Sequence, residues 1–406
     1  MPVDEIRDNF ISHALNLQGF DAKLQGKMRT MLRALEKNLM RQLEEADVLN
    51  TGSPRRIARR NALLQQTQLT IQTAYNKLYR QVESDLLDVA GSESMHAKNI
   101  TNETFNASVM TTTITPDQAE AIVGRSMIEG EIQKKWWKQQ GERTQFNFAR
   151  EIRQGMLQGE GMEQMARRIA GSATGGFDTI TLASGKTRRI ARRSGGVINK
   201  SIREARTLVR TGVQTVANEA LAKTFERNRD VIKGVQALVT FDLRTSDICI
   251  ARSGGAWDFD GKPLPGSPIQ EPFPGIPPWH FNCRTVLTPV FKSFKEMGIN
   301  VSKKFKKMPR GQRASMDGLV GEDVTYDQWL RGRTEVEQNE VLGKGKAKLW
   351  RKGKITSRQL INSSGRSYTL LELDKKAENN RKKLPGEQKV KTVAKKKKRK
   401  FRLHLN

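Results

Sequence analysis

The chain has 406 residues, enough for two or three domains, and only 36% of them are hydrophobic while 28% are charged, which indicates extended helices rather than one large globule. The formal net charge of +29 predicts an anionic partner, although charge that only keeps the protein soluble is the alternative. No apolar run approaches the roughly 18 to 20 residues of a membrane span, and the acidic start "MPVDEIRDNF" lacks the apolar segment of a signal peptide. We therefore expect a cytosolic protein without a membrane partner, whose two cysteines are reduced.

The first hundred residues show two apolar stripes with steps of three and four residues, the pattern of amphipathic helices. The first stripe lies between Asp21 and Ala46 and the second between Leu64 and Val89, and "NTGSP" (50–54) separates them. Residues 1–115 are therefore predicted to form an N-terminal hairpin of two antiparallel helices. The polar stretch "GSESMHAKNITNETF" (91–105) is predicted to be a linker.

Residues 116–300 are predicted to form a central core that mixes helices with a small sheet or hairpin. The pattern favours helices over 116–169, a β-hairpin around Ser184-Gly185, and a long helix over 197–228. "VQALVTFD" and "TVLTPV" are predicted strands, the second ended by Pro289, on either side of the proline-rich loop 253–278. The predicted fold class is α+β and predominantly α-helical.

Residues 301–373 are predicted to form a basic connector followed by a helical module, and residues 374–406 a disordered basic tail. The stretch 375–406 holds 14 Lys and Arg against two Glu and has no hydrophobic pattern. Nucleic acid is the expected partner of this tail. The predicted DNA-binding residues are Lys395, Lys396, Lys397, Lys398, Arg399, Lys400 and Arg402.

The stretch "HFNCR" brings together His280, Asn282 and Cys283 in a chain with only four histidines and two cysteines. A zinc site needs about four ligands, and Cys249 with Asp247 are the further candidates. The second cysteine of a Cys-x-x-Cys pair is missing, however, since Ala251 and Arg252 stand near its place.

Three other interpretations of the cluster are open. A Cys-His-Asn catalytic group needs the cysteine and histidine to face each other with an exposed thiolate, and an HNH-type nuclease needs a second histidine ligand. Alternatively, His280, Asn282 and Arg284 hold the proline-rich loop by hydrogen bonds while Cys249 and Cys283 pack together. We favour this structural role and predict no metal and no cofactor.

The sequence contains no motif of a known catalytic class. The glycine-rich stretches "GLVGEDVT" and "LGKGKAK" lack the spacing of a phosphate-binding loop. Neither a Gly-x-Ser-x-Gly elbow nor a His-Glu-x-x-His helix occurs. We therefore predict no catalytic residues and no enzymatic activity.

The run "GVQALVTFDLRTSDICIARSGGAWDFDGK" and the later "PPWHFNCRTVLTPV" resemble the phage Mu F-like minor head proteins, also called phage head morphogenesis proteins. The resemblance extends over roughly residues 120–373. The matching residues, which we predict to form a structural cluster, are Asp242, Arg244, Thr245, Cys249, His280, Asn282, Cys283 and Arg284. Many members of the family carry two further cysteines that suggest zinc, whereas Arg252 and Thr285 stand around those places here.

The resemblance implies a minor capsid protein at the portal vertex and inside the head, acting in head assembly and in DNA packaging or ejection. The implied partners are the portal protein, the major capsid or scaffold protein, and double-stranded DNA bound without base readout. The implied location is the virion, with the host cytoplasm during assembly. From the resemblance and from apolar stripes taken to be exposed, we expect the N-terminal hairpin to dock on the portal or shell. The alternative is a nucleic-acid-processing enzyme or toxin-type effector carried on a Mu F-like domain.

Overall fold

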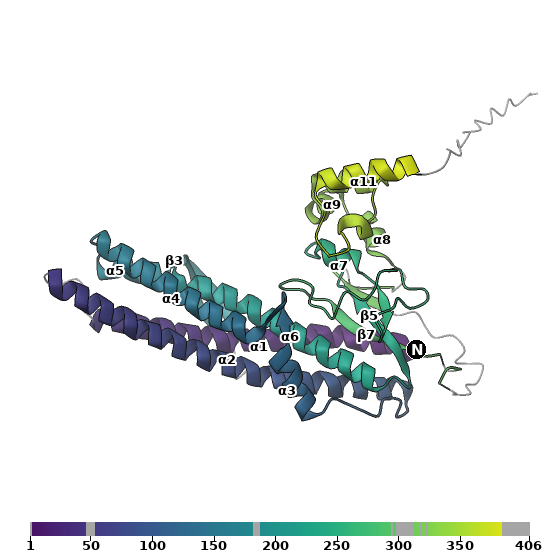
Figure 1. The fold of residues 1–406 in the computed structure, drawn as a ribbon, viewed down its shortest axis with the longest axis horizontal. Helices are drawn as coiled ribbons and strands as arrows, with labels where there is room; N and C mark the ends of the chain where they lie inside the picture. The colour runs from purple at the N-terminus through teal and green to yellow at the C-terminus, as the bar shows by residue number, and fades with distance from the viewer. Residues whose placement is uncertain are drawn as a thin grey trace, which may run out of the picture.

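The molecule is elongated, with long helices lying lengthwise and a smaller helical module standing on one end (Figure 1). The computed structural model describes residues 2–45, 53–181, 187–293, 295–297, 312–316, 318–321 and 324–383. Helices dominate these residues and the sheets are small and antiparallel, so the predicted fold class is confirmed. None of the described helices has an apolar stretch long enough to cross a membrane.

Two long antiparallel helices form the N-terminal region, as predicted. Helix α1 spans Pro2–Glu45 and α2 spans Ser53–Phe105, while the predicted break at 50–52 lies outside the described residues. All residues of the two predicted stripes are buried in the main core or packed against it. Because the stripes are covered by the protein itself, our expectation that they are exposed for docking is wrong.

The predicted linker 91–105 is also wrong, because α2 continues through it to Phe105. Its polar residue Ser94 is buried and bonded rather than solvated. Ser94 Oγ accepts hydrogen bonds from Ile114 N at 2.9 Å and from Thr224 Oγ1 at 2.7 Å. Polar side chains on a helix face can be buried when groups on neighbouring segments satisfy their hydrogen bonds.

Helices α4 (Gln133–Leu157) and α6 (Val197–Arg227) pack against the hairpin to complete a four-helix bundle. A chain of hydrogen bonds crosses its interior: Tyr75 Oη lies 2.9 Å from Thr144 Oγ1, which lies 2.8 Å from Ser201 Oγ. Burial raises the pKa of Tyr75 to about 12. Between α2 and α4 come α3 (Pro116–Arg125), β1 (Met127–Ile128) and β2 (Glu131–Ile132).

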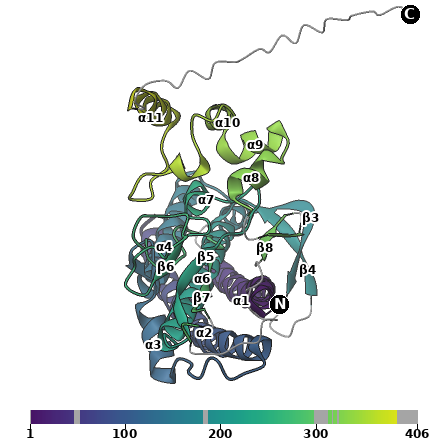
Figure 2. The same cartoon turned by 90° about the vertical axis from the view of Figure 1, so that its right-hand side faces the viewer.

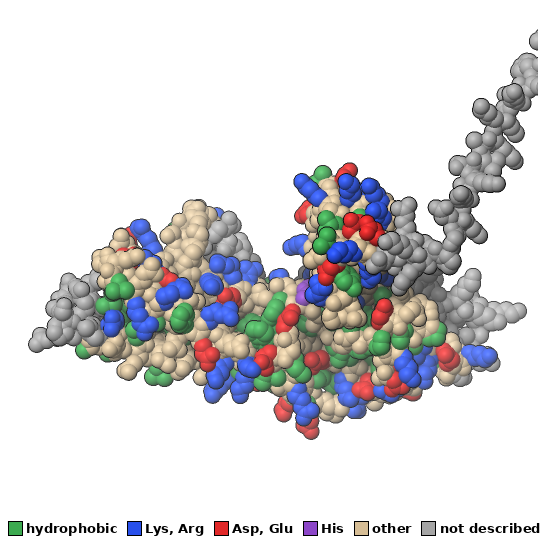
Figure 3. Space-filling view, turned by 45° about the horizontal axis from the view of Figure 1, so that its top comes forward, with side chains coloured by type: hydrophobic (Ala, Val, Ile, Leu, Met, Phe, Trp, Pro, Cys, Tyr) green, Lys and Arg blue, Asp and Glu red, His purple; other side chains and the backbone are tan. Residues whose placement is uncertain are grey.

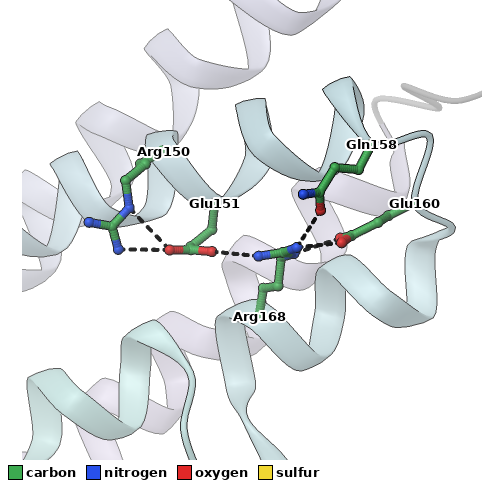
Figure 4. Close-up of polar contacts among 5 residues, drawn as sticks. All are labelled: Arg150, Glu151, Gln158, Glu160 and Arg168. Carbon is green, nitrogen blue, oxygen red and sulfur yellow. Dashed lines mark hydrogen bonds and ion pairs between the residues drawn. The ribbon is translucent and has the colours of Figure 1, made fainter.

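A network of ion pairs joins α4 to α5 (Met162–Ala170) across the turn between them (Figure 4). Arg168 on α5 donates to Glu151 Oε2 at 3.1 Å, to Gln158 Oε1 at 2.7 Å and to Glu160 Oε2 at 2.6 Å. The Arg168 guanidinium lowers the pKa of Glu160. The predicted helices over 116–169 are thus present as α3, α4 and α5.

The predicted hairpin is present as β3 (Ser172–Thr181) paired with β4 (Thr187–Ser194), with Ser184-Gly185 outside the described residues. Figure 2 shows this ribbon to one side of the bundle, near α1. Gly196 then begins the turn into α6 with a φ of 76°, and a Cβ there would lie 2.2 Å from Gly171 N. Only glycine fits this close approach.

A three-stranded antiparallel sheet of order β6-β5-β7 follows α6. The strands are β5 (Ile232–Leu238), β6 (Ala256–Asp258) and β7 (Val286–Phe291), with α7 (Asp247–Ala251) in the connection after β5. The expectation that Pro289 ends the second strand is wrong, because Pro289 pairs with Val235 and β7 continues to Phe291. As β7 is an edge strand, the missing N–H of a proline is tolerated there.

The C-terminal module has its own core, which includes Phe241 and Ile250 from the connection after β5. Its elements are β8 (Gln312–Ser315), β9 (Gly318–Gly321), α8 (Tyr326–Arg331), α9 (Glu335–Leu342), α10 (Lys344–Arg351), a 3₁₀ helix at Ser357–Leu360, and α11 (Leu370–Lys383). The predicted start of the tail is too early, because α11 runs to Lys383. Most of the predicted connector and all seven predicted DNA-binding residues lie outside the described residues.

Candidate functional site: a cysteine–histidine cluster held by an ion pair

Two loops that are distant in sequence meet beside α6 to form the site. The first runs from the end of β5 into α7, whose N-cap Ser246 accepts a hydrogen bond from Cys249 N at 3.3 Å. The second leads into β7 and carries His280, Cys283 and Arg284. Because β5 pairs with β7 in the sheet, the end of one strand and the start of the other lie side by side.

An ion pair between Asp242 and Arg284 ties the two loops together. Arg284 Nη1 lies 2.5 Å from Asp242 Oδ2, and Nη2 lies 2.8 Å from Oδ1. Asp242 Oδ1 also accepts from Arg244 N at 2.9 Å, and Thr245 Oγ1 lies 3.0 Å from it. Burial acts to raise the pKa of Asp242, but the hydrogen bonds and charge of Arg284 outweigh it and the pKa is lowered.

The two sulfur atoms and the imidazole lie in contact behind this ion pair. Cys249 Sγ is 3.5 Å from Cys283 Sγ and 3.1 Å from His280 Nε2. His280 Nε2 is also 2.8 Å from Ser246 Oγ, while Nδ1 is 2.8 Å from the carbonyl oxygen of Phe281. A carbonyl only accepts, so Nδ1 carries a proton and Nε2 of the neutral ring is the acceptor.

Both cysteines of the cluster are buried while His280 is half-buried, and the neighbouring groups shift the pKa values of all three. Cys249 and Cys283 are only 4% and 1% exposed. The hydrogen bond from Cys249 lowers the pKa of Cys283, and the same contact with burial raises the pKa of Cys249. Burial lowers the pKa of His280, but contacts with Cys283 and the Phe281 carbonyl outweigh it and the pKa is raised.

Three of the residues needed for a zinc site come together here. The ligand atoms of Cys249, His280 and Cys283 all lie within 4.8 Å of one another. The fourth candidate from the sequence, Asp247, instead pairs with Lys346 Nζ at 2.8 Å. Structural zinc is usually held by four protein ligands, so the described residues fit a metal only in part.

Helix α6 holds the second loop through side chains that the sequence analysis did not single out. Asn282 N donates to Thr211 Oγ1 at 3.0 Å, and Asn282 itself has a φ of 60°, a conformation that asparagine tolerates. Asn218 Nδ2 donates to Thr285 O at 2.9 Å and its Oδ1 accepts from Leu287 N at 2.9 Å. The buried polar positions of α6 were a signal for this contact, because polar groups inside a helix bundle need partners.

The C-terminal module rests directly on the cluster loop. Tyr326 Oη donates to Asp242 O at 3.0 Å, and the Tyr326 ring lies 5.1 Å from the Phe241 ring. Lys346 on α10 pairs with Asp247 at the start of α7. The loop that carries Asp242 therefore joins the sheet, the cluster and the module.

Of the eight predicted cluster residues, Asp242, Thr245 and Arg284 form one bonded group and Cys249, His280 and Cys283 form another. Asn282 is bonded through its backbone to Thr211 on α6, and Arg244 lies apart from both groups. Its backbone nitrogen bonds to Asp242, but its side chain is exposed. Arg244 therefore lies at the edge of the cluster, facing the pocket described below.

Residues 146–288, from α4 to β7, match the family model described as Phage Mu protein F like protein. This stretch, about a third of the chain, contains the whole cluster, so the segment that carries the site is similar to the Mu F-like proteins. The suspected resemblance is confirmed over residues 146–288, and the match supports a phage head-morphogenesis protein associated with the virion. No curated protein and no solved structure gave a significant match to the chain.

Proposed function

We propose that the chain is a minor head protein that associates with the portal and the head interior and contacts packaged DNA without reading its sequence. The observation that carries the proposal is the family match over the segment that holds the cluster. The charge of +29 supports it independently, because Lys and Arg neutralise phosphates and release counterions.

The folded part and the tail differ in how their charged residues are distributed. In Figure 3 basic side chains are spread over bundle and module with acidic ones among them. Residues 384–406 instead hold nine Lys and Arg against one Glu. We infer that the tail supplies most of the DNA contact.

The DNA contact is tested by deleting residues 384–406, which leaves α11 intact. DNA affinity should fall, and the slope of log affinity against log salt should weaken by about 0.9 for each phosphate that the tail no longer neutralises. A matched variant keeps the tail length but replaces its nine Lys and Arg by Gln, and it should behave like the deletion. Unchanged affinity and salt dependence in both would contradict the proposed role of the tail.

The portal association is tested with the full chain and purified portal protein. Deletion of α1 and α2 is not suitable, because their stripes form the core of the bundle. Co-purification of the two full-length proteins, together with mass spectrometry that finds the chain in purified heads, is the expected result. Absence from heads would overturn the proposed function.

We also propose that the chain has no catalytic activity, because both sulfur atoms are buried and neither cysteine presents an exposed thiolate as a nucleophile. The rival function, a nucleic-acid-processing enzyme or toxin-type effector, predicts cleavage or modification of DNA or RNA. Incubation of the full chain with both nucleic acids and divalent metal ions should leave them intact, and cleavage that His280→Ala abolishes would favour the rival.

A further inference from the structure

A pocket with a cavity of about 420 Å³ lies where α1, α6 and the two cluster loops meet. Helix α1 contributes Asp21 and Gln25, and α6 contributes Arg206 and Arg210. The cluster loops add Arg244 and Arg284. The volume lies in the range of ligand-binding pockets, and the site is built from the same loops that carry the family motif.

The pocket has more positive than negative charge. Four arginines line the pocket, and the nearby carboxylates are those of Asp21 in the lining and of Asp242 behind it. Asp242 forms an ion pair with Arg284. In the described part of the chain, Arg206 and Arg210 use only Nε, which bonds to Gln25 Oε1 at 2.9 Å and to Asp21 Oδ2 at 3.3 Å. Their remaining N–H groups are therefore available to bind a ligand.

Arg244 is the group that the fold itself does not use. Among the described residues its guanidinium makes no hydrogen bond or ion pair, in contrast to Arg284, which binds Asp242 with two nitrogens. The tie between the loops thus accounts for Asp242, Thr245 and Arg284 but leaves Arg244 unexplained. An exposed arginine at the mouth of a basic pocket is suited to an anionic group that comes from outside.

The shape and the other lining groups decide which anion fits. Leu17, Ala22 and Val213 give the pocket an apolar part, while the amide groups of Gln25 and Gln214 are held by hydrogen bonds to Asp21 and to the carbonyl oxygen of Thr285. Duplex DNA presents convex rows of phosphates that need an open basic surface, whereas a side chain can enter a cavity between helices. A carboxylate on a carbon chain satisfies both parts of the lining.

We propose that this pocket binds an acidic protein segment, with a Glu or Asp side chain or a C-terminal carboxylate held by Arg206, Arg210 and Arg244. The inference rests on the proposed function in so far as the segment belongs to the portal or another head protein. It makes the cluster loops a recognition element as well as a structural tie.

The experiment compares Arg244→Gln with Arg203→Gln in the full chain. Arg203 is exposed on α6, the helix that also carries Arg206 and Arg210, and it does not line the pocket. Both variants lose one positive charge. Binding of a fluorescent poly-glutamate peptide is followed by anisotropy at physiological salt, with poly-glutamine as the neutral probe. Arg244→Gln should weaken poly-glutamate binding about tenfold, as expected for a hydrogen bond to a charged group, and Arg203→Gln less than about twofold.

Equal weakening by the two variants would mean attraction by net charge alone and would overturn the proposal. So would a variant Arg244→Gln that weakens binding of short duplex DNA but not of poly-glutamate. Binding of purified portal protein by the same variants separates this proposal from the proposed function. If wild-type protein does not bind portal but shows peptide binding that depends on Arg244, the proposed portal association is wrong and the proposed acidic-segment site is supported. If both variants bind portal equally well and bind poly-glutamate with the same affinity, the proposed acidic-segment site is wrong and the portal association is supported.

Discussion

The four-helix bundle and the cluster region are stabilised by different kinds of contact. In the bundle, apolar residues recur along each helix and pack into one continuous core. In the cluster region, segments about forty residues apart are tied by a few polar contacts, above all Asp242 with Arg284. The bundle is stabilised by many apolar contacts spread along its helices, whereas the cluster loops are held by a few individual polar contacts.

The largest expected effect is a cavity in the bundle. Leu39 is 0% exposed, so Leu39→Ala should lower the free energy of unfolding by about 2 to 5 kcal/mol. Urea unfolding followed by helical circular dichroism measures this. Leu69→Ala is the matched control, because Leu69 is 65% exposed and its truncation should change stability by less than about 0.5 kcal/mol. Similar effects of the two would refute the assignment of the core.

A smaller effect is expected from breaking the tie between the cluster loops. Asp242→Asn removes the charge that binds Arg284 and should cost about 2 kcal/mol, while Asp260→Asn in the exposed part of the proline-rich loop should cost almost nothing. The unfolding of the sheet region, followed by hydrogen exchange of β5 and β7 amides, separates this effect from changes in the bundle. Equal protection in both variants would show that the ion pair does not hold the loops.

The same pair predicts a dependence on pH. The folded-state pKa of Asp242 is lowered from its usual value of 3.8, so its contribution is present above that value and is lost as pH falls through the folded pKa. The difference in stability between wild type and Asp242→Asn should therefore be constant near neutral pH and shrink below about pH 4. A difference that persists in acid would point to packing rather than charge.

A still smaller effect tests how α6 holds the second loop. Thr211→Val removes the acceptor of Asn282 N and should cost about 1 kcal/mol. Thr207→Val, one turn earlier, removes only an exposed hydrogen bond to Arg203 O and serves as the control. Weaker hydrogen-exchange protection confined to residues near Asn282 would be the signature, and equal effects of the two changes would contradict it.

The last prediction concerns the metal. Since Asp247 is paired with Lys346, the described cluster offers three ligands, and we expect purified protein to contain no stoichiometric zinc. Elemental analysis after purification without chelators measures this. One zinc per chain that Cys283→Ser removes would reverse the interpretation and make the cluster a metal centre.

Local periodicity was enough to predict the bundle helices, the hairpin and the two strands, because side chains three and four or two positions apart share a face whatever surrounds them. The stripes of α1 and α2 and the apolar side of α6 were found in this way. The same reasoning failed for 91–105, since Ser94 is buried through hydrogen bonds that only the neighbouring helix and loop supply. It also ended the second strand too early at Pro289, because an edge strand tolerates proline and strand order is not visible in a pattern.

The sequence by itself determined which residue types could form the cluster: two cysteines, a histidine near one of them, and an aspartate and arginine of opposite charge. Only the tertiary structure decided their roles, since the pairing of β5 with β7 sets which side chains of the two loops meet. In that arrangement the sulfurs are buried, Asp247 pairs with Lys346, and Arg244 lies at the mouth of a basic pocket. Contacts between segments distant in sequence depend on the packing of the whole chain, and no local pattern encodes them.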